Sequence, residues 1–236
     1  MIKAGWKPSS LRKINMQPQH TNQMDGMVAI VTGGSRGLGR AIAQEFAAEG
    51  AKVVVSARRK SPTGLPGTAV GTAERIRQQG GEAMALTCDV SNEEQVMAMV
   101  GQTIDMYGQI DVLVNNAGVM VLGKTLLDIV PDEWDQSVET SLKGTYLCCR
   151  AVVPTMVEQG RGSIINIGSR MGSDHEQGGG VLYSSTKAAV HMFSYCLADE
   201  VREHNIAVNV LSPGGLKTEG SAAIPWTQRD WEQRVE

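Results

Sequence analysis

Short apolar runs alternate with longer amphipathic stretches along most of this chain. The apolar runs predict six strands, at residues 27–31, 51–55, 83–87, 110–114, 163–167 and 207–211. The stretches between them repeat apolar residues at helical spacing and predict helices at 38–49, 73–79, 91–107, 132–158 and 183–203. Because strands and helices alternate, we predict an α/β fold with a doubly wound parallel sheet and three α/β/α layers.

Polar residues predict where two of these helices begin. Ser91 and Glu94 have the spacing of a capping box, in which each side chain accepts a hydrogen bond from a backbone N–H group. Asp132 is placed to cap the long helix that reaches Glu158. Both helices would therefore begin at a side chain that accepts a hydrogen bond from an unpaired backbone N–H group of the first turn.

The composition fits one folded domain preceded by a tail. Hydrophobic residues make up 42% of the chain of 236, which is enough for one large core over residues 25–236. Residues 1–24 contain Lys3, Lys7, Arg12 and Lys13 but no acidic residue and little apolar periodicity. We predict a disordered or extraneous tail there, and a weak organelle-targeting signal is the alternative.

Charge and cysteine usage exclude several classes of protein. The net charge of −3 argues against a nucleic-acid binder with a basic face. No apolar run approaches the roughly 20 residues that span a membrane. The four cysteines form no CxxC pair, so we predict no metal site and no disulfide framework, and we expect a reducing, cytoplasmic setting.

A glycine-rich turn follows the first strand and opens the first helix. Glycines in such a turn let the backbone approach a pyrophosphate at the helix N-terminus. A plain strand–helix turn is the alternative, but the strand before the turn and the helix after it favour a Rossmann-like dinucleotide site. The residues predicted to bind the cofactor here are Gly33, Ser35, Arg36, Gly37, Leu38 and Gly39.

The end of the second strand bears on the choice of cofactor. A dinucleotide-binding fold that prefers NAD(H) carries an acidic residue there, whereas this chain has Arg58, Arg59 and Lys60. Arg36 adds a guanidinium inside the glycine turn, and guanidinium groups suit a 2′-phosphate. We therefore predict that NADP(H) is preferred, with NAD(H) possible; a solvated basic surface run is the alternative.

Tyr183 and Lys187 lie four residues apart, so a helix would place both on one face. A nearby cation lowers the pKa of a phenol, which brings the phenol closer to proton transfer near neutral pH. Without other motifs, such a pair is more often the surface of an amphipathic helix.

Five motifs occur in order along the chain, and together they resemble the short-chain dehydrogenase/reductases. They are the glycine turn, Asn115-Asn116-Ala117-Gly118, Ser169, the pair Tyr183 and Lys187, and Pro213-Gly214. The resemblance covers about residues 26–219, and the sequence as a whole resembles the subgroup that contains 3-oxoacyl-carrier-protein reductases. It implies hydride transfer between a nicotinamide and a small-molecule carbonyl or secondary alcohol.

The resemblance also implies a role for each matching residue. Tyr183 would be the general acid and base, Lys187 would lower its pKa and hold the nicotinamide ribose, and Ser169 would polarise the substrate oxygen. A structural role as a hydrogen-bonding residue at a strand end is the alternative for Asn115, and a helix-start position is the alternative for Asp89. The further residues implied to contact the cofactor are Asp89, Val90, Asn116, Ala117, Gly118, Pro213, Gly214 and Thr218.

One position departs from the family pattern. Ser141 stands where the family usually has an Asn that supports a water relaying protons to the active-site lysine. A serine hydroxyl is shorter and lacks the fixed donor and acceptor of an amide, so we expect a weakened relay. Ser141 therefore completes the candidate catalytic set with Ser169, Tyr183 and Lys187.

Two segments are expected to contact substrate, residues 170–182 and 215–236. The first contains His175, for which a solvated loop position is the better interpretation. The second contains Trp226 and Trp231, which could form a lid or pack on the body. A catalytically weak, cofactor-binding protein that acts as a redox sensor or partner subunit is the alternative to an enzyme.

The resemblance extends to assembly and to the end of the chain. We expect a homodimer or homotetramer formed through the helices at 132–158 and 183–203, although burial within one subunit is the alternative. Relatives usually continue through another helix and a seventh strand. We therefore expect this seventh strand to be missing and the strand at 207–211 to form an unpaired parallel edge.

Overall fold

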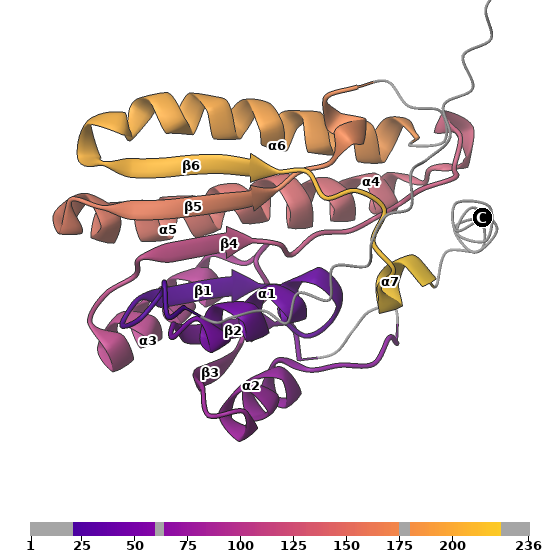
Figure 1. Ribbon diagram of the computed structural model, residues 1–236. Coiled ribbons are helices and arrows are strands. Elements are labelled where there is room, and N and C mark those ends of the chain that lie inside the picture. The colour runs from indigo at the N-terminus through magenta and orange to yellow at the C-terminus, as the bar shows by residue number, and fades with distance from the viewer. Residues whose placement is uncertain (1–20, 60–63, 175–179, 223–236) are drawn as a thin grey trace, which may run out of the picture.

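A six-stranded parallel sheet forms the middle layer of the computed structural model, which describes residues 21–59, 64–174 and 180–222 (Figure 1). The strand order is β3-β2-β1-β4-β5-β6, and every neighbouring pair is parallel. The chain reverses direction across the sheet between β1 and β4, as a doubly wound fold requires. The predicted fold class is therefore confirmed. The strands are β1 Val28–Thr32, β2 Lys52–Ala57, β3 Glu82–Thr87, β4 Val112–Asn115, β5 Gly162–Ile167 and β6 Ile206–Leu211.

Helices connect these strands and cover the sheet. The α-helices are α1 Gly37–Ala48, α2 Ala69–Gln78, α3 Glu93–Tyr107, α4 Pro131–Ser137, α5 Gly144–Gln159, α6 Val181–Glu200 and the short α7 Glu219–Ala222. Single 3₁₀ turns occur at η1 Leu126–Asp128, η3 Arg170–Gly172 and η4 Arg202–His204. The single helix predicted over 132–158 is wrong in detail, because a π-helical segment, η2 Val138–Lys143, separates α4 from α5.

Both predicted helix caps are wrong by one or two residues. The N-cap of α3 is Asn92, whose side chain accepts the N–H of Gln95 at 2.9 Å, while the Ser91 hydroxyl donates to Asp89 at 2.7 Å. Asp132 lies inside the first turn of α4, which begins at Pro131. Proline suits this first position because its missing N–H would have had no partner in the helix.

Two hydrophobic cores hold the layers together, one on each face of the sheet. Side chains of a strand alternate between faces, so Ile30 of β1 packs toward α3, α5 and α6, while Val31 packs toward α1 and α2. Both residues are fully buried, as are Leu113 and Ile164 in the first core. Because helices cover both faces of the sheet here, nearly every residue of β1, β2 and β4 is buried, which explains their nearly continuous apolar runs.

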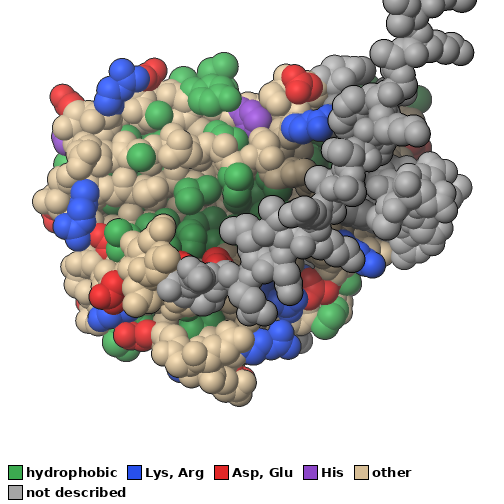
Figure 2. Space-filling view, viewed as in Figure 1, with side chains coloured by type: hydrophobic (Ala, Val, Ile, Leu, Met, Phe, Trp, Pro, Cys, Tyr) green, Lys and Arg blue, Asp and Glu red, His purple; other side chains and the backbone are tan. Residues whose placement is uncertain are grey.

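β6 is covered less completely than the strands at the other end of the sheet. Ile206 is buried against α6, but Ala207, Asn209 and Leu211 point the other way and are exposed. In the part of the chain that the structure describes, β6 pairs with β5 alone. Figure 2 shows hydrophobic side chains at the surface over β4 and β5 on this same face. Among the described residues, no helix has the length and apolarity needed to cross a bilayer.

Candidate active site

The glycine turn between β1 and α1 packs directly against the segment that follows β4. Gly33 has φ +64°, in the left-handed region, and a Cβ on it would lie 2.9 Å from Cα of Ala117. A Cβ on Gly39 would overlap the Asn116 amide and come within 2.6 Å of the Gly33 carbonyl oxygen. Because both places are filled by neighbouring backbone or by Asn116, these positions require glycine.

Asn116 holds this turn in place through its amide and its backbone. Its side-chain N–H groups donate to the carbonyl oxygens of Thr32 at 3.0 Å and Gly33 at 3.1 Å. The backbone N–H groups of Asn116 and Ala117 both donate to the Thr32 hydroxyl at 3.1 Å. Two predicted cofactor residues, Asn116 and Ala117, therefore support the glycine turn, and Gly118 follows them as an exposed residue.

A carboxylate occupies the N-terminus of α1. Glu219 of α7 accepts the N–H of Gly37 at 3.0 Å and forms an ion pair with Arg40. Burial opposes the charge of Glu219, but its hydrogen bonds, to backbone N–H groups and to Arg40, lower its pKa. The first turn of a helix favours an anion because its N–H groups are unpaired and the helix dipole is positive there. Thr218, beside Glu219, approaches Gly37.

The other predicted cofactor residues lie at the carboxyl ends of β1, β2 and β3. Arg36 is the residue before α1, and Arg58 follows β2, with Thr32 and Ser56 paired in the sheet just before them. Asp89 follows β3, and its carboxylate accepts hydrogen bonds from the backbone N–H and hydroxyl of Ser91. The remaining members of this group are Ser35 and Val90, which are buried, and Leu38, which is partly buried; Lys60 lies outside the described residues.

Tyr183, Lys187 and Ser169 come together where β5 meets α6. The Lys187 ammonium donates to the carbonyl oxygen of Ile167, the last residue of β5, at 2.7 Å, and lies 5.9 Å from the Tyr183 ring centre. Ser169 lies near enough to Tyr183 for its hydroxyl to lower the pKa of the phenol. One turn of α6 carries Tyr183 and Lys187, and the segment after β5 brings Ser169 to them although it lies 14 residues before Tyr183 in the sequence.

Burial controls the proton affinities in this group. It lowers the pKa of Lys187 to about 8, because a charged ammonium is costly to bury. It also raises the pKa of Tyr183, and the hydrogen bond from Ser169 opposes this effect without cancelling it. The prediction that the pKa of Tyr183 is lowered is therefore wrong for the protein alone, since desolvation outweighs the stabilisation of the phenolate.

Ser141 lies in the π-helical segment and reaches the same place from the opposite side. Its hydroxyl accepts the N–H of Val119 at 3.1 Å, and its side chain is buried. A Cβ on Gly118 would stand 3.3 Å from the Ser141 hydroxyl and 3.8 Å from the Lys187 ammonium. Ser141 and Lys187 therefore flank Gly118, and all four candidate catalytic residues surround one location.

Comparison with known proteins places this arrangement in a family. The family model for short chain dehydrogenases matches residues 27–229. Over 196 residues the chain is 37% identical to a 3-oxoacyl-[acyl-carrier-protein] reductase from Synechocystis sp., covering 83% of this chain and 76% of that relative. Over 209 residues it is 35% identical to elsinochrome reductase 1 from Elsinoe fawcettii, covering 89% and 75%.

The chain belongs to the short-chain dehydrogenase/reductase family. Solved structures agree with this conclusion. A metagenomic short-chain oxidoreductase in complex with NADP has a TM-score of 0.73 at 36% identity, covering 82% of this chain and 84% of that one. A short-chain type dehydrogenase/reductase from Mycobacterium marinum has a TM-score of 0.74 at 33% identity, covering 82% and 76%. The family consists of oxidoreductases with a Rossmann-type NAD(P)-binding fold.

This short-chain dehydrogenase/reductase also contains site residues that sequence reasoning missed. His191, one turn beyond Lys187 on α6, accepts the N–H of Ser169 at 3.3 Å. Asn166 of β5 is fully buried; its oxygen accepts from the Asn115 amide at 2.9 Å, and its amide donates to the Ser194 hydroxyl at 2.8 Å. The spacing of 187, 191 and 194 is helical, so the sequence could have placed His191 and Ser194 on the same face of α6 as Lys187, but not their partners after and on β5. Asn115, as expected, is a hydrogen-bonding residue at a strand end.

Parts of both predicted substrate segments of this dehydrogenase lie outside the described residues. These parts include His175, Trp226 and Trp231. The described parts place Arg170–Gly172 as a 3₁₀ turn beside α6, with Pro213, Gly214 and Thr218 between the end of β6 and α7.

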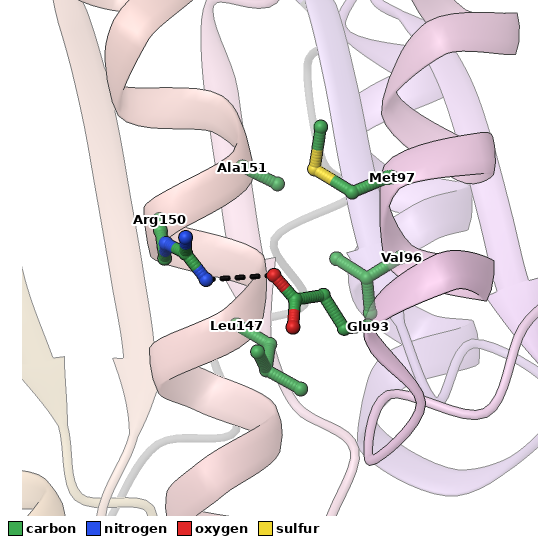
Figure 3. A pocket seen from close by; sticks show the side chains of 6 residues that line it. All are labelled: Glu93, Val96, Met97, Leu147, Arg150 and Ala151. Carbon is green, nitrogen blue, oxygen red and sulfur yellow. Dashed lines mark hydrogen bonds and ion pairs between the residues drawn. The ribbon is translucent and has the colours of Figure 1, made fainter.

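A hollow of about 200 Å³ lies between α3 and α5, apart from the candidate site (Figure 3). An ion pair between Arg150 and Glu93, with N and O atoms 2.7 Å apart, bridges the two helices across it. Both side chains are more than half exposed, so this pair contributes little stability. The remaining lining residues are Val96, Met97, Leu147 and Ala151.

Proposed function

We propose that this protein is an NADP(H)-dependent oxidoreductase that interconverts a carbonyl compound and a secondary alcohol. The observation that carries this proposal is the meeting of Ser169, Tyr183 and Lys187 after β5, at the same carboxyl edge of the sheet as the glycine turn that follows β1. Ligands of doubly wound sheets bind at this edge. The arrangement of these residues and the family of the chain therefore both favour hydride transfer between a nicotinamide and a carbonyl or alcohol.

The glycine turn fits a dinucleotide. Its backbone approaches the segment after β4 so closely that Cβ atoms on Gly33 or Gly39 would overlap it, and the N-terminus of α1 presents N–H groups to an anion. Glu219 already places a carboxylate on the N–H of Gly37. The cofactor would lie between two sets of residues. One set is the glycine turn with Arg36, Arg58, Asp89, Val90 and the 116–118 segment, and the other is Pro213, Gly214 and Thr218.

The chain's own residues perform the acid–base part of the reaction. When bound, the nicotinamide supplies or accepts the hydride. In carbonyl reduction the Tyr183 hydroxyl donates its proton to the carbonyl oxygen, and Ser169 donates a hydrogen bond that polarises this oxygen. The Lys187 ammonium stabilises the Tyr183 phenolate that remains, and the proton is then restored from solvent past Ser141. In alcohol oxidation the same proton moves in the opposite direction.

Two arginines support NADP(H) over NAD(H). Arg36 and Arg58 follow two paired strands at the same end of the sheet, and no acidic residue ends β2. A guanidinium forms paired hydrogen bonds with a phosphate. A relative in this family is described in complex with NADP, which agrees with this preference.

The experiment follows NADPH consumption across a panel of ketones and aldehydes, with the Tyr183→Phe variant as its control. We expect turnover by the wild type and a loss of about 100-fold or more in Tyr183→Phe, because the ring remains but its proton is gone. NADPH affinity should be unchanged in this variant. Turnover that survives the substitution would contradict the assigned role of Tyr183.

The second candidate function is a catalytically weak protein that binds the cofactor as a redox sensor or partner subunit. Ser141 at the usual Asn position and the raised pKa of Tyr183 favour it. Tight NADPH binding without turnover on any carbonyl of the panel would support this candidate. Turnover on any member of the panel would exclude it.

We also propose that the protein forms a homo-oligomer and works in the cytoplasm. A homodimer or homotetramer through α5 and α6 is supported by exposed Tyr146, Met192 and Tyr195 on these helices, and sedimentation would test it. Cys88, Cys148 and Cys149 are buried free thiols, which suits a reducing compartment such as the cytoplasm.

A further inference from the structure

The side chain of His191 connects the ends of the two strands that border the catalytic group. Its Nε2 atom accepts the backbone N–H of Ser169, after β5, at 3.3 Å and lies 3.4 Å from the hydroxyl of Ser212, after β6. The contact is close: a Cβ on Gly168 would overlap Nε2 and come within 2.5 Å of Val210. His191 is 7% exposed. The imidazole therefore fills the space under the turn that carries Ser169.

These contacts select one chemical form of the ring. A nitrogen that accepts a backbone N–H must have a free lone pair, so Nε2 is unprotonated and the neutral ring carries its hydrogen on Nδ1. The Ser212 hydroxyl can then donate to the same nitrogen. In the protonated ring both nitrogens are donors, so Nε2–H could donate only to the Ser212 hydroxyl and the N–H of Ser169 would lose its acceptor.

We propose that neutral His191 is a positioning residue that fixes the backbone of Ser169 and of Ser212, and through them the substrate-polarising hydroxyl and the Pro213-Gly214 segment. This inference rests on the proposed function. His191 acts through its neighbours and touches neither substrate nor cofactor. Its helix, α6, also carries Tyr183 and Lys187, so one rigid element sets all three side chains relative to Ser169.

The surroundings of His191 keep it neutral. Lys187 lies one turn earlier on α6, and burial together with the positive charge of Lys187 lowers the pKa of His191 from its ordinary value of 6.5. Tyr195, one turn later, meets the imidazole edge-to-face with ring centres 6.3 Å apart. The groups that meet it from the segments after β5 and β6 are Gly168, Ser169 and Ser212, none of which is charged.

The sign of the pH effect follows from this shift. The neutral, accepting form persists as pH falls to 6.5 and is lost only further into the acid range, below the ordinary histidine pKa. Turnover should fall in the same range, because protonation removes the acceptor for Ser169. Lys187 and Tyr183 titrate at higher pH, so they do not account for an acid limb.

Two substitutions separate the accepting nitrogen from the bulk of the ring. His191→Gln can place its amide oxygen near the Nε2 position and does not titrate, whereas His191→Met fills space without an acceptor. We expect His191→Gln to keep kcat within about threefold at neutral pH and to lose the acid limb of the kcat profile. We expect kcat to fall about tenfold in His191→Met, because the partly buried N–H of Ser169 loses its partner. His204→Gln, at a partly exposed position of the η4 turn, is the matched control and should keep the wild-type profile.

NADPH affinity and ring-nitrogen NMR complete the test. The Nδ1–H tautomer at neutral pH and an unchanged Kd for NADPH in His191→Gln support the proposal, even if His191→Met does not fold. An Nε2–H tautomer, an acid limb that survives in His191→Gln, or unchanged kcat in folded His191→Met would overturn it. If the wild type turns over no carbonyl, the proposed function fails separately, and the tautomer still decides the geometry of His191.

Discussion

The cofactor side and the catalytic side of this sheet edge are held together by different means. On the cofactor side, Gly33 and Gly39 let backbone and the Asn116 amide meet at close range. On the catalytic side, the contacts run from polar side chains of α6, with Lys187 donating to the carbonyl oxygen of Ile167 and His191 accepting the N–H of Ser169.

The difference predicts what each side tolerates. The glycine turn depends on the absence of side chains, so adding a single methyl group damages it. The end of β5 depends on buried donors and acceptors, so removing one polar group damages it, because its partners lose their hydrogen bonds without regaining water. Substitutions of opposite kinds should therefore separate cofactor binding from catalysis.

The largest effect is expected for Gly39→Ala. The added Cβ would overlap the Asn116 amide and the Gly33 carbonyl oxygen, so the turn must open and the amide must move. We expect cofactor affinity to fall about 100-fold and the free energy of unfolding to fall by about 1–3 kcal/mol, as for overpacked sites. Titration with NADPH and denaturant unfolding measure both quantities.

Gly101→Ala is the matched control for this change. Gly101 lies in α3, and a Cβ there would have nothing within 4 Å. Alanine is favoured over glycine in a helix by about 1 kcal/mol, so this variant should gain stability and keep its cofactor affinity. Equal affinities for Gly39→Ala and Gly101→Ala would contradict the packing argument.

On the catalytic side, Asn166→Ala should cost about 2–4 kcal/mol of unfolding free energy, because it leaves Asn115 and Ser194 without their shared partner. Turnover should fall more than NADPH affinity, since these bonds join β4, β5 and α6 beneath the catalytic group. Asn209→Ala, at an exposed position of β6, should change stability by less than about 0.5 kcal/mol. Similar losses in both variants would rule out a special role for the buried amides.

A smaller effect is expected where the cofactor side meets solvent. Arg36→Ala and Arg58→Ala should each weaken NADPH binding about tenfold while changing NADH binding little, because only NADPH carries the 2′-phosphate. Arg59→Ala, at the exposed neighbouring position, is the control and should leave the ratio of the two affinities unchanged. An unchanged ratio in all three variants would favour a solvated basic run at the end of β2.

The smallest effect is expected for Glu219→Gln. Its carboxylate accepts the N–H of Gly37 at the N-terminus of α1. An anionic cofactor would be attracted to the same positive end of the helix dipole. Removing the charge should tighten NADPH binding about threefold, since a like charge near a phosphate costs a fraction of a kcal/mol to about 1 kcal/mol. Glu200→Gln, exposed at the end of α6, is the control. Weaker binding would instead mean that Glu219 closes α7 over the cofactor.

The sequence predicts the cofactor side better than the catalytic side for a physical reason. Glycine spacing and apolar runs report local backbone geometry, so the order of strands and helices and the turn at Gly33–Gly39 followed directly from them. The contacts of Asn166 and His191 depend on how α6 is rotated against β5, which no local pattern specifies. Ser91 failed as a cap because Asn92 takes that position, and Asp132 failed because Pro131 begins α4 and makes Val130 the N-cap.

The π-helical segment Val138–Lys143 also constrains how this chain can vary in length. Such a segment accommodates one more residue than an α-helical turn of the same rise. Deleting any single residue from it would let α4 and α5 join as one continuous α-helix, and would rotate one part relative to the other by about 100°. Ser141 would leave Val119, or the buried Cys148 and Cys149 would turn toward solvent. The number of residues in this segment is therefore under tighter constraint than most of their identities.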